Sequence, residues 1–357
     1  MADPLFDETN SAEPQTRRAP HDGCIVCGRR EQVTLCSADA IAAQQQYLDR
    51  FHRQRLRRSR RGADPALADR AAFTQDEPVA IVACRRCGHV YRAARPRSAE
   101  AVETYADDAY GAARLAALFA SQLEQFRAKI PRLRALLDAE VPRIVEIGSF
   151  VGGFLAAARE QGWPALGIDP GEEVGRFCRS KNLSVETTTA PAAAIAAGSI
   201  DCVAIWNTFD QLPDPRPTLA AAVRWLRPGG LLVVRVPNGA AFRAAARAAA
   251  ALPAAARGPL LAAMAWNNLL TFPYLQGYTI ASLDRLIGET GARRVALDTD
   301  VLTRLADAQN TAWAAAEERG LKLAWRALGH LAPRQAPWFD AYYRIPPAGA
   351  ARASASA

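Results

Sequence analysis

The sequence predicts an α/β protein with a doubly wound, mostly parallel sheet, preceded by a small cysteine-rich module. From residue 142 onward, short apolar runs typical of strands alternate with stretches of helical length. Repeated strand–helix units form parallel sheets with helices on both faces. Before residue 98, two pairs of cysteines with the same spacing bracket a long insertion. These two observations divide the chain into a small N-terminal module and a larger α/β domain.

The larger domain is expected to hold seven strands. They are predicted at residues 143–148, 165–169, 183–187, 200–206, 229–237, 293–297 and 337–345. Stretches with helical character separate most of them, at residues 152–161, 172–181, 217–226 and 282–291. Each helix lies between two strands, which is the order that a parallel sheet requires.

The remaining residues define the other expected domain boundaries. Residues 1–20 and 346–357 are low in complexity or rich in polar residues and proline, so we expect both ends to be disordered. Residues 21–97 form the cysteine-rich module, in which Ile41, Leu48 and Phe51 have helical spacing after a capping Ser37. Residues 98–140 are predicted as a linker of one or two helices, and residues 141–345 as the α/β domain.

Composition and charge narrow the class of protein. The chain has 357 residues, of which 50% are hydrophobic, and a formal net charge of +8. Its basic residues are nearly all arginine and alanine is abundant, which indicates a coding bias more than a polyanionic partner. No apolar stretch reaches the ~20 residues of a membrane span, and the acidic first ten residues do not resemble a secretion signal. We therefore expect a cytosolic protein without a membrane partner.

A glycine-containing turn follows the first strand of the α/β domain. Gly148, Gly152 and Gly153 stand there, but Phe150 occupies the place of the second glycine of a dinucleotide-binding motif. A bulky side chain there opposes close approach of a pyrophosphate, which disfavours a nicotinamide cofactor. Asp169 ends the next strand, where a carboxylate can accept both hydroxyl groups of a ribose. S-adenosylmethionine, a nucleoside without a pyrophosphate, fits this pattern.

The ordered set of motifs from Arg143 to Asn238 resembles the class I S-adenosylmethionine-dependent methyltransferases. "VEIGSFVGG", "GIDP" and "LRPGGLLVV" are similar to their glycine motif, their second-strand acid and their turn into the fifth strand. The resemblance implies a Rossmann-like sheet and a site that binds S-adenosylmethionine. It places Gly148, Ser149 and Gly152 beside the methionine end, Glu146 toward the amino group, Asp169 on the ribose and Asn207 near the methionine portion and the substrate.

The sequence departs from the family after the fourth strand, where Asp210-Gln211 replaces the common Glu-His pair. No histidine lies between His89 and His330, so a histidine general base from the core is not expected. The methyl group of a sulfonium is already activated, and catalysis chiefly requires positioning and exclusion of water. If a base is needed, Asp210, Tyr274 and Tyr278 are the candidates. Each has an alternative reading as a structural residue, by packing, helix capping or surface pairing.

The two cysteine pairs predict a structural zinc site. Cys24 and Cys27, like Cys84 and Cys87, are separated by two residues and followed by glycine. Two such pairs supply four thiolates, which form a closed tetrahedral zinc site. Redox thiols and a metal-free cluster are the alternatives. The stretch from Cys87 to Gly111 is similar to methyltransferases that carry an N-terminal zinc ribbon, among them sugar C-methyltransferases.

Three functions are compatible with these features. The first is a methyltransferase acting on a small molecule, such as a sugar or a secondary metabolite. The second is an RNA or protein methyltransferase that docks its substrate on the zinc module and the arginine-rich segment Arg50–Arg61. The third is a non-enzymatic binding module with a decayed methyltransferase fold. Few aromatic residues that could stack on bases lie near the arginines, which disfavours nucleic acid, and the intact glycine turn disfavours decay.

Overall fold

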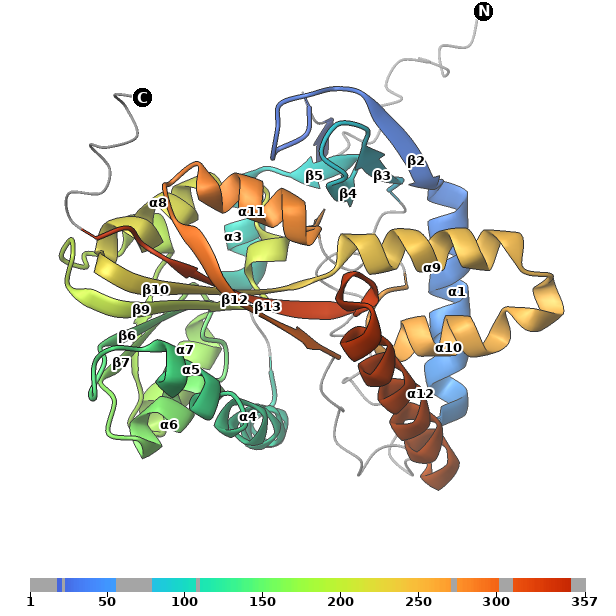
Figure 1. Ribbon diagram of the computed structural model, residues 1–357. Coiled ribbons are helices and arrows are strands. Elements are labelled where there is room, and N and C mark those ends of the chain that lie inside the picture. The colour runs from blue at the N-terminus through green and yellow to red at the C-terminus, as the bar shows by residue number, and fades with distance from the viewer. Residues whose placement is uncertain are drawn as a thin grey trace, which may run out of the picture.

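A computed structural model describes residues 18–20, 23–55, 79–106, 110–270, 275–301 and 311–347. These residues form a central sheet covered by helices, a small sheet around the cysteine pairs, and a group of helices beside them (Figure 1). Of the two ends predicted to be disordered, 1–20 and 346–357, residues 1–17 and 348–357 lie outside the described residues, as does the segment 56–78. Residues 18–20 form a short strand, contrary to the prediction.

The central sheet has seven strands in the order β12-β13-β10-β9-β6-β7-β8. Neighbours among β6 to β10 pair in parallel, whereas β13 runs antiparallel to both β10 and β12. The predicted doubly wound, mostly parallel sheet of seven strands is therefore confirmed. The strand bounds are β6 (Ile144–Ile147), β7 (Ala165–Asp169), β8 (Ser184–Thr187), β9 (Ile200–Trp206), β10 (Leu226–Pro237), β12 (Arg293–Asp300) and β13 (Trp338–Arg344).

Helices cover both faces of this sheet (Figure 1). One face carries α4 (Ala112–Arg127), α5 (Ile130–Leu136), α6 (Gly153–Glu160) and α7 (Glu172–Ser180). The other face carries α3 (Ser98–Ala106), α8 (Arg216–Trp225) and α11 (Ile280–Gly288). Aromatic rings of Phe126, Phe154 and Trp206 meet at centroid distances of 5.4 to 5.6 Å and join α4 and α6 to β9. The stretch 98–140 thus contains three helices where one or two were predicted.

The cysteine-rich module is completed by a strand from the C-terminal half of the chain. Its antiparallel sheet has the order β11-β4-β3-β2. The members are β2 (Gln32–Cys36), β3 (Ile81–Cys84), β4 (Val90–Arg92) and β11 (Gln276–Gly277), and a separate pair joins β1 (Arg18–Pro20) to β5 (Ala94–Pro96). The module is therefore joined to the central domain by main-chain pairing as well as by sequence.

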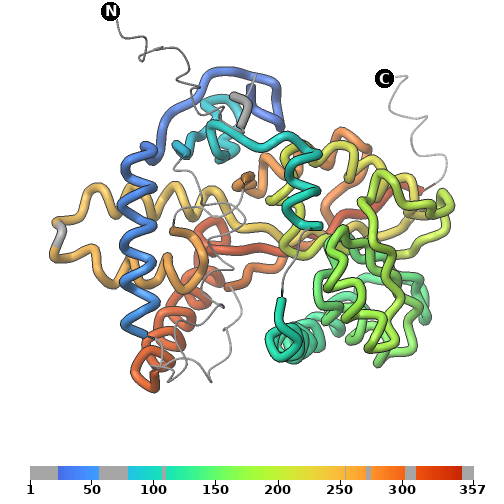
Figure 2. The backbone as a smooth tube through the Cα atoms, turned by 180° about the vertical axis from the view of Figure 1, so that it is seen from behind, coloured from blue at the N-terminus to red at the C-terminus, as the bar shows by residue number. Residues whose placement is uncertain are grey.

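The group of helices consists of α1 (Ala38–Arg55), α9 (Gly239–Ala251), α10 (Gly258–Trp266) and α12 (Ala312–Leu331) (Figure 2). Ile41 and Phe51 of α1 are buried in one apolar core with residues of α9, α10 and α12. The backbone N–H of Ala40 donates to the Ser37 hydroxyl oxygen at 3.2 Å, so the predicted helix start is confirmed. Short 3₁₀ helices complete the fold: η2 (Ala190–Ala192), η3 (Phe209–Gln211), η4 (Ala254–Ala256) and η5 (Pro333–Gln335).

Candidate functional site

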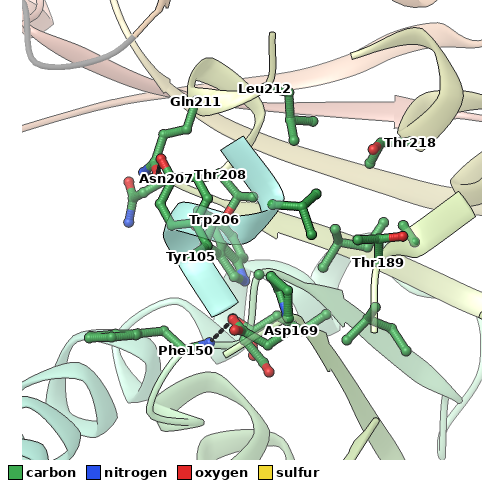
Figure 3. Close-up of a pocket in the computed structure, with 18 of the residues that line it drawn as sticks. Tyr105, Phe150, Asp169, Thr189, Trp206, Asn207, Thr208, Gln211, Leu212 and Thr218 are labelled. Carbon is green, nitrogen blue, oxygen red and sulfur yellow. Dashed lines mark hydrogen bonds between the residues drawn. The ribbon is translucent and has the colours of Figure 1, made fainter. Parts of the chain in front are cut away.

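A cavity of about 860 Å³ opens at the carboxyl ends of β6, β7, β8 and β9. Ligands bind at this edge in open parallel sheets, because the loops there leave a crevice. The far wall is formed by α3, by α4 and by the loop from η3 to α8 (Figure 3). Of the predicted cofactor residues, five lie on the lining: Glu146, Gly148, Ser149, Asp169 and Asn207.

The glycine turn between β6 and α6 is shaped by backbone angles that glycine favours. Gly148 has φ of 74° and Gly152, the N-cap of α6, has φ of 76°. A Cβ atom on Gly148 would lie 2.0 Å from the Thr208 hydroxyl oxygen, so the turn and the loop after β9 approach each other closely. Phe150 also has a positive φ, of 45°, and its ring packs edge-on against Tyr110. Gly152 thus shapes the turn without lining the cavity.

Asp169 joins the end of β7 to the glycine turn. One carboxylate oxygen accepts the backbone N–H of Phe150 at 2.7 Å, and the other accepts that of Gly171 at 2.9 Å. A carboxylate has about four lone pairs, so each oxygen can still accept a further hydrogen bond. The side chain lines the cavity and is 9% exposed. Its geometry allows it to hold the turn and to accept hydroxyl groups of a ligand together.

Glu146 lies on β6 beneath the turn, at 2% exposure. Its Oε2 atom has no hydrogen-bond partner among the described residues. Burial raises the pKa of this carboxyl well above its ordinary value, and the negative charge of Asp169 raises it further. A buried, unpartnered carboxylate is costly unless a cationic or hydrogen-bonding group of a ligand meets it. The Ser149 hydroxyl, also buried without a partner, lies on the same wall.

Asn207 follows β9 directly and is held from two sides. Arg235 of β10 donates from Nη1 to the Asn207 side-chain oxygen at 2.7 Å. Gln211 donates from its side-chain nitrogen to the Asn207 carbonyl oxygen, and its own Oε1 accepts the Tyr105 hydroxyl at 2.8 Å. Asn207 has φ of 55°, a left-handed conformation that asparagine tolerates better than most residues. Tyr105, Asn207 and Gln211 thus form one connected group on the cavity wall (Figure 3).

Two of the three predicted general bases are buried away from this wall. Asp210 and Tyr278 are both 0% exposed, and neither belongs to the cavity lining. Burial raises the pKa of Asp210 to about 8, and it raises the pKa of Tyr278 well above its ordinary range. A base must reach within hydrogen-bond distance of the proton that it removes, and the described geometry does not offer this. Tyr274 lies outside the described residues.

The residues that close the cavity opposite the strands were not predicted from the sequence. Tyr105 of α3 and Gln211 of η3 meet across the site although 106 positions separate them in the chain. Gln211 was noticed only as a departure from a family pattern, and Tyr105 lay in a predicted linker. Arg235 reads as one charged residue within the apolar run "LLVVRVP". A buried charge in such a run was the available signal, because charged residues are rarely buried unless paired.

The match to known proteins covers the strand ends and the glycine turn of this cavity but not its α3 wall. Residues 119–293, from within α4 to the first residue of β12, match a protein family described as a methyltransferase domain. The match includes the glycine turn, Asp169 and Asn207. These residues form a class I S-adenosylmethionine-dependent methyltransferase domain. The expected fold and enzyme class are therefore confirmed, and so is S-adenosylmethionine as the methyl-donating cofactor.

Curated relatives of this methyltransferase include two enzymes from bacteria. It is 29% identical over 228 residues to a trans-aconitate 2-methyltransferase of Azoarcus sp. (strain BH72), covering 54% of this chain and 86% of the relative. It is 32% identical over 103 residues to a ubiquinone biosynthesis O-methyltransferase of Methylococcus capsulatus (strain ATCC 33009 / NCIMB 11132 / Bath), covering 27% of this chain and 44% of the relative. A crystal structure of a SAM-dependent methyltransferase from Archaeoglobus fulgidus aligns with a TM-score of 0.43 at 16% identity, covering 62% of this chain and 94% of that one.

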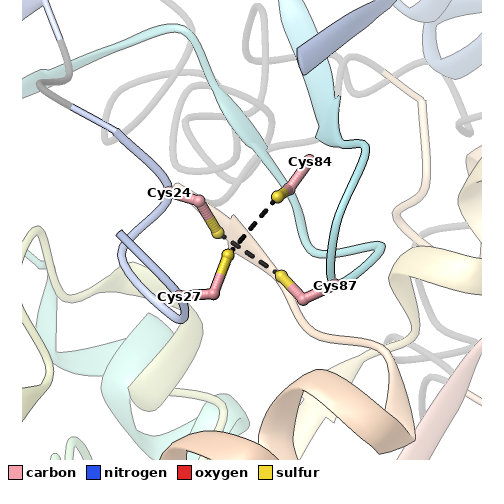
Figure 4. A group of neighbouring side chains, drawn as sticks. All are labelled: Cys24, Cys27, Cys84 and Cys87. Atoms are coloured by element: carbon pink, nitrogen blue, oxygen red, sulfur yellow. Dashed lines mark hydrogen bonds between the residues drawn. The ribbon is translucent and has the colours of Figure 1, made fainter. Parts of the chain in front are cut away.

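The four cysteines of the methyltransferase's N-terminal module come together, as their spacing predicts (Figure 4). Their sulfur atoms all lie within 4.8 Å of one another. Cys24 and Cys87 are 3.5 Å apart at sulfur, as are Cys27 and Cys84, so each contact joins one pair to the other. The side chain of Arg216, at the start of α8, donates to the Ile25 carbonyl oxygen and fastens the first pair to the central domain. Among the described residues, no helix is long and apolar enough to cross a membrane.

Proposed function

We propose that this methyltransferase transfers the methyl group of S-adenosylmethionine to a small molecule that binds in the same cavity. The observation that carries the proposal is the cavity itself, about 860 Å³ and walled by α3 and η3 on the side opposite the glycine turn. Small-molecule sites span about 300–1,000 Å³, so this cavity has room for the cofactor and a modest acceptor. The names of the two curated relatives, which refer to small-molecule substrates, support the same class.

The cofactor is proposed to bind along the carboxyl ends of β6 and β7. Asp169 would accept the ribose hydroxyls while it holds Phe150 and Gly171. Gly148, Ser149 and Gly152 would shape the turn beside the methionine end, and the unpartnered oxygen of Glu146 would face the amino group. The cofactor supplies an activated methyl group on a sulfonium. Tyr105, Asn207 and Gln211 would orient the acceptor and the methionine end and exclude water, which is the main catalytic demand of such a transfer.

Asp210 and Tyr278 are proposed to support the site from behind. Leu275 donates its backbone N–H to the Asp210 carbonyl oxygen at 3.0 Å, so the main chain of η3 is tied to the segment before β11. The Tyr278 ring packs against Phe209 of η3 at a centroid distance of 5.4 Å. Both residues therefore help to place Gln211, the neighbouring residue that reaches the cavity.

A labelling experiment tests the small-molecule acceptor. The purified protein is incubated with S-adenosylmethionine that carries a radioactive methyl group and with a cell extract separated into small molecules, RNA and protein. We expect label to enter the small-molecule fraction, and Asp169→Asn to reduce it strongly. Label that enters RNA and is released by nuclease, or that enters protein, would contradict the proposal and favour a macromolecular substrate.

The alternative, an RNA or protein methyltransferase, rests on the arginine-rich segment Arg50–Arg61. The described part of this segment includes Arg55, whose guanidinium pairs with Glu317 at 2.7 and 2.9 Å and lies over the Phe51 ring at 3.6 Å. Arg55 therefore joins α1 to α12 and is engaged inside the protein. Arg57, Arg58, Arg60 and Arg61 lie outside the described residues, and the labelling experiment tests their proposed role.

The four cysteines are proposed to bind one structural zinc ion. A tetrahedral site with Zn–S bonds of about 2.3 Å places neighbouring sulfur atoms about 3.8 Å apart. Two of the sulfur–sulfur distances here are 3.5 Å and none exceeds 4.8 Å, which fits that arrangement. Four thiolates close the coordination shell, so the ion would stabilise the module and take no part in methyl transfer.

A further inference from the structure

Asn207 is oriented by a residue that lies outside the cavity. Arg235 is 0% exposed on β10 and is not part of the cavity lining. An arginine side chain can only donate hydrogen bonds. Because its Nη1 atom lies 2.7 Å from the Asn207 side chain, the atom of Asn207 that it contacts must be the oxygen. The NH2 group of the Asn207 carboxamide is thereby directed away from Arg235.

The side chain of Gln211, the next residue along this wall, is oriented in the same way. A backbone carbonyl can only accept, so the group of Gln211 that contacts the Asn207 carbonyl must be its NH2 group. The Gln211 side-chain oxygen is then the atom that meets the Tyr105 hydroxyl at 2.8 Å. The Arg235 guanidinium can only donate hydrogen bonds, and the Asn207 backbone carbonyl can only accept them. Together they determine which atom of the Asn207 and Gln211 side-chain amides is the oxygen and which is the nitrogen.

Arg235 is itself held firmly. Its guanidinium lies 3.1 Å from a carboxylate oxygen of Asp300 and 3.1 Å from one of Asp340. Lys129 pairs with both of these aspartates, so the group contains two cations and two anions, of which Arg235 and Asp340 are buried. Burial would raise the pKa of Asp300, but Arg235 and Lys129 outweigh that effect and lower it to about 2. A charge-balanced group of this kind keeps the guanidinium in one position and leaves little net charge behind Asn207.

The cavity therefore has two poles on neighbouring strands. Glu146, on β6, has a carboxylate oxygen without a partner among the described residues. Asn207, just beyond β9, lines the cavity, and its carboxamide NH2 group is not engaged by Arg235. β6 and β9 pair directly, with Glu146 opposite Ala204, so both poles belong to the same part of the sheet. An amino acid carries an ammonium and a carboxylate on one carbon, and these two poles are complementary to it.

We propose that Arg235 is a positioning residue that directs the NH2 group of Asn207 to the carboxylate of the cofactor's methionine end, while Glu146 meets the ammonium. This inference rests on the binding of S-adenosylmethionine and is independent of the acceptor. The role of Arg235 is to orient the Asn207 carboxamide. It would act only through Asn207, without contacting the ligand.

The test compares two sulfonium ligands that differ only in the carboxylate, and a neutral thioether that lacks the whole amino-acid end. Calorimetry measures the Kd of S-adenosylmethionine, of decarboxylated S-adenosylmethionine, which keeps the amino group, and of methylthioadenosine, which lacks both groups. Asn207→Asp keeps a side-chain oxygen for Arg235 and replaces the donor by an acceptor. We expect this variant to raise the Kd of S-adenosylmethionine at least about tenfold more than that of the decarboxylated ligand. The reason is that a hydrogen bond to the charged carboxylate is lost.

Arg235→Lys preserves the charge but not the directed contact, so the Asn207 carboxamide can rotate. We expect this variant to lower the preference for S-adenosylmethionine over its decarboxylated form about fivefold or more, and to add little to Asn207→Asp in the double variant. Glu146→Gln should raise the Kd of S-adenosylmethionine and of its decarboxylated form, and leave the Kd of methylthioadenosine unchanged. Arg294→Lys, which alters an ion-paired arginine on β12 outside the cavity, is the matched control.

The ratio between ligands separates positioning from a general structural role. A variant that merely loosens the fold raises the Kd of all three ligands by a similar factor. This result for Arg235→Lys would overturn the proposal. An Asn207→Asp variant that prefers S-adenosylmethionine over its decarboxylated form as strongly as the unaltered protein would also overturn it, and would place Asn207 on the acceptor instead. Neither result depends on the labelling experiment, so a failure here is distinct from a failure of the small-molecule acceptor.

Discussion

At the scale of single residues, Asp169 links cofactor recognition to the shape of the glycine turn. Its two carboxylate oxygens already accept the backbone N–H groups of Phe150 and Gly171. Asp169→Asn removes the charge and one acceptor oxygen while it preserves the size of the side chain. A hydrogen bond to a charged group contributes about 1.5–3 kcal/mol, so the Kd of S-adenosylmethionine should rise at least about tenfold by calorimetry.

The control for Asp169 is Glu186→Gln, which removes an exposed carboxylate from the neighbouring strand β8 outside the cavity. It should leave the Kd unchanged. An Asp169→Asn variant that is folded, as judged by circular dichroism, and binds the cofactor as tightly as the unaltered protein would show that the ribose is held elsewhere.

Asp210 makes stability depend on pH. Burial raises its pKa to about 8, so the folded protein keeps a proton that the unfolded chain releases near pH 4. The stabilising effect of that proton is complete below the unfolded pKa and is lost as the pH rises to about 8. Asp210→Asn should flatten the fall in the free energy of unfolding over this range, as measured with urea.

Asp49→Asn is the matched control for Asp210, because the side chain of Asp49 on α1 is 73% exposed. It should reproduce the pH profile of the unaltered protein. If Asp210→Asn follows that same profile, the Asp210 carboxyl is ionised in the folded state at neutral pH and must have a partner that the present geometry does not provide.

At the scale of elements, the sequence predicts best what depends on local pattern. The strands β6, β7 and β9 were placed to within a residue, because their apolar runs are bounded by glycine, proline or polar residues. The capped start of α1 was equally local. By contrast, neither α9 nor α10 was predicted. The apolar sequence of α10 has little contrast between faces, and β11, two residues long, has no detectable period.

The same distinction applies to the site. Gly148 and Asp169 could be placed because each stands at the end of a predicted strand, and parallel strands end at one edge. Tyr105 and Arg235 could not be assigned, because their roles come from contacts between distant parts of the chain. Asp210 was chosen from its position after a strand, but the turn of η3 directs Gln211 to the cavity and Asp210 into the interior.

At the scale of the whole molecule, the cysteine module is connected to the acceptor side of the cavity. β4 follows the second cysteine pair and binds β11, with Tyr91 opposite Gln276 and Val90 opposite Gly277. The Gln276 side chain donates to the Leu212 carbonyl oxygen at 3.4 Å, and Leu212 lines the cavity. The glycine turn and Asp169 lie in the central sheet, which shares no strand with the module.

Loss of the proposed zinc should therefore affect the acceptor side of the cavity and leave cofactor binding nearly unchanged. Cys84→Ser combined with Cys87→Ser should reduce zinc from about one ion per chain toward zero by elemental analysis, because two thiolates do not complete a tetrahedral shell. Residues 23–97 should become sensitive to protease, since the ion offsets the entropy of closing a long loop. The Kd of S-adenosylmethionine should stay within about twofold, whereas methyl transfer to the small-molecule fraction should fall as η3 loses its support through β11.

Cys36→Ser serves as the control for this double variant, because Cys36 lies on β2 outside the four-cysteine cluster. It should retain one zinc ion and full methyl transfer. An unaltered protein without zinc would contradict the proposed metal site. Zinc loss that abolishes cofactor binding while the module resists protease would contradict the separation between the module and the glycine turn, because the ion would then act on the cofactor half directly.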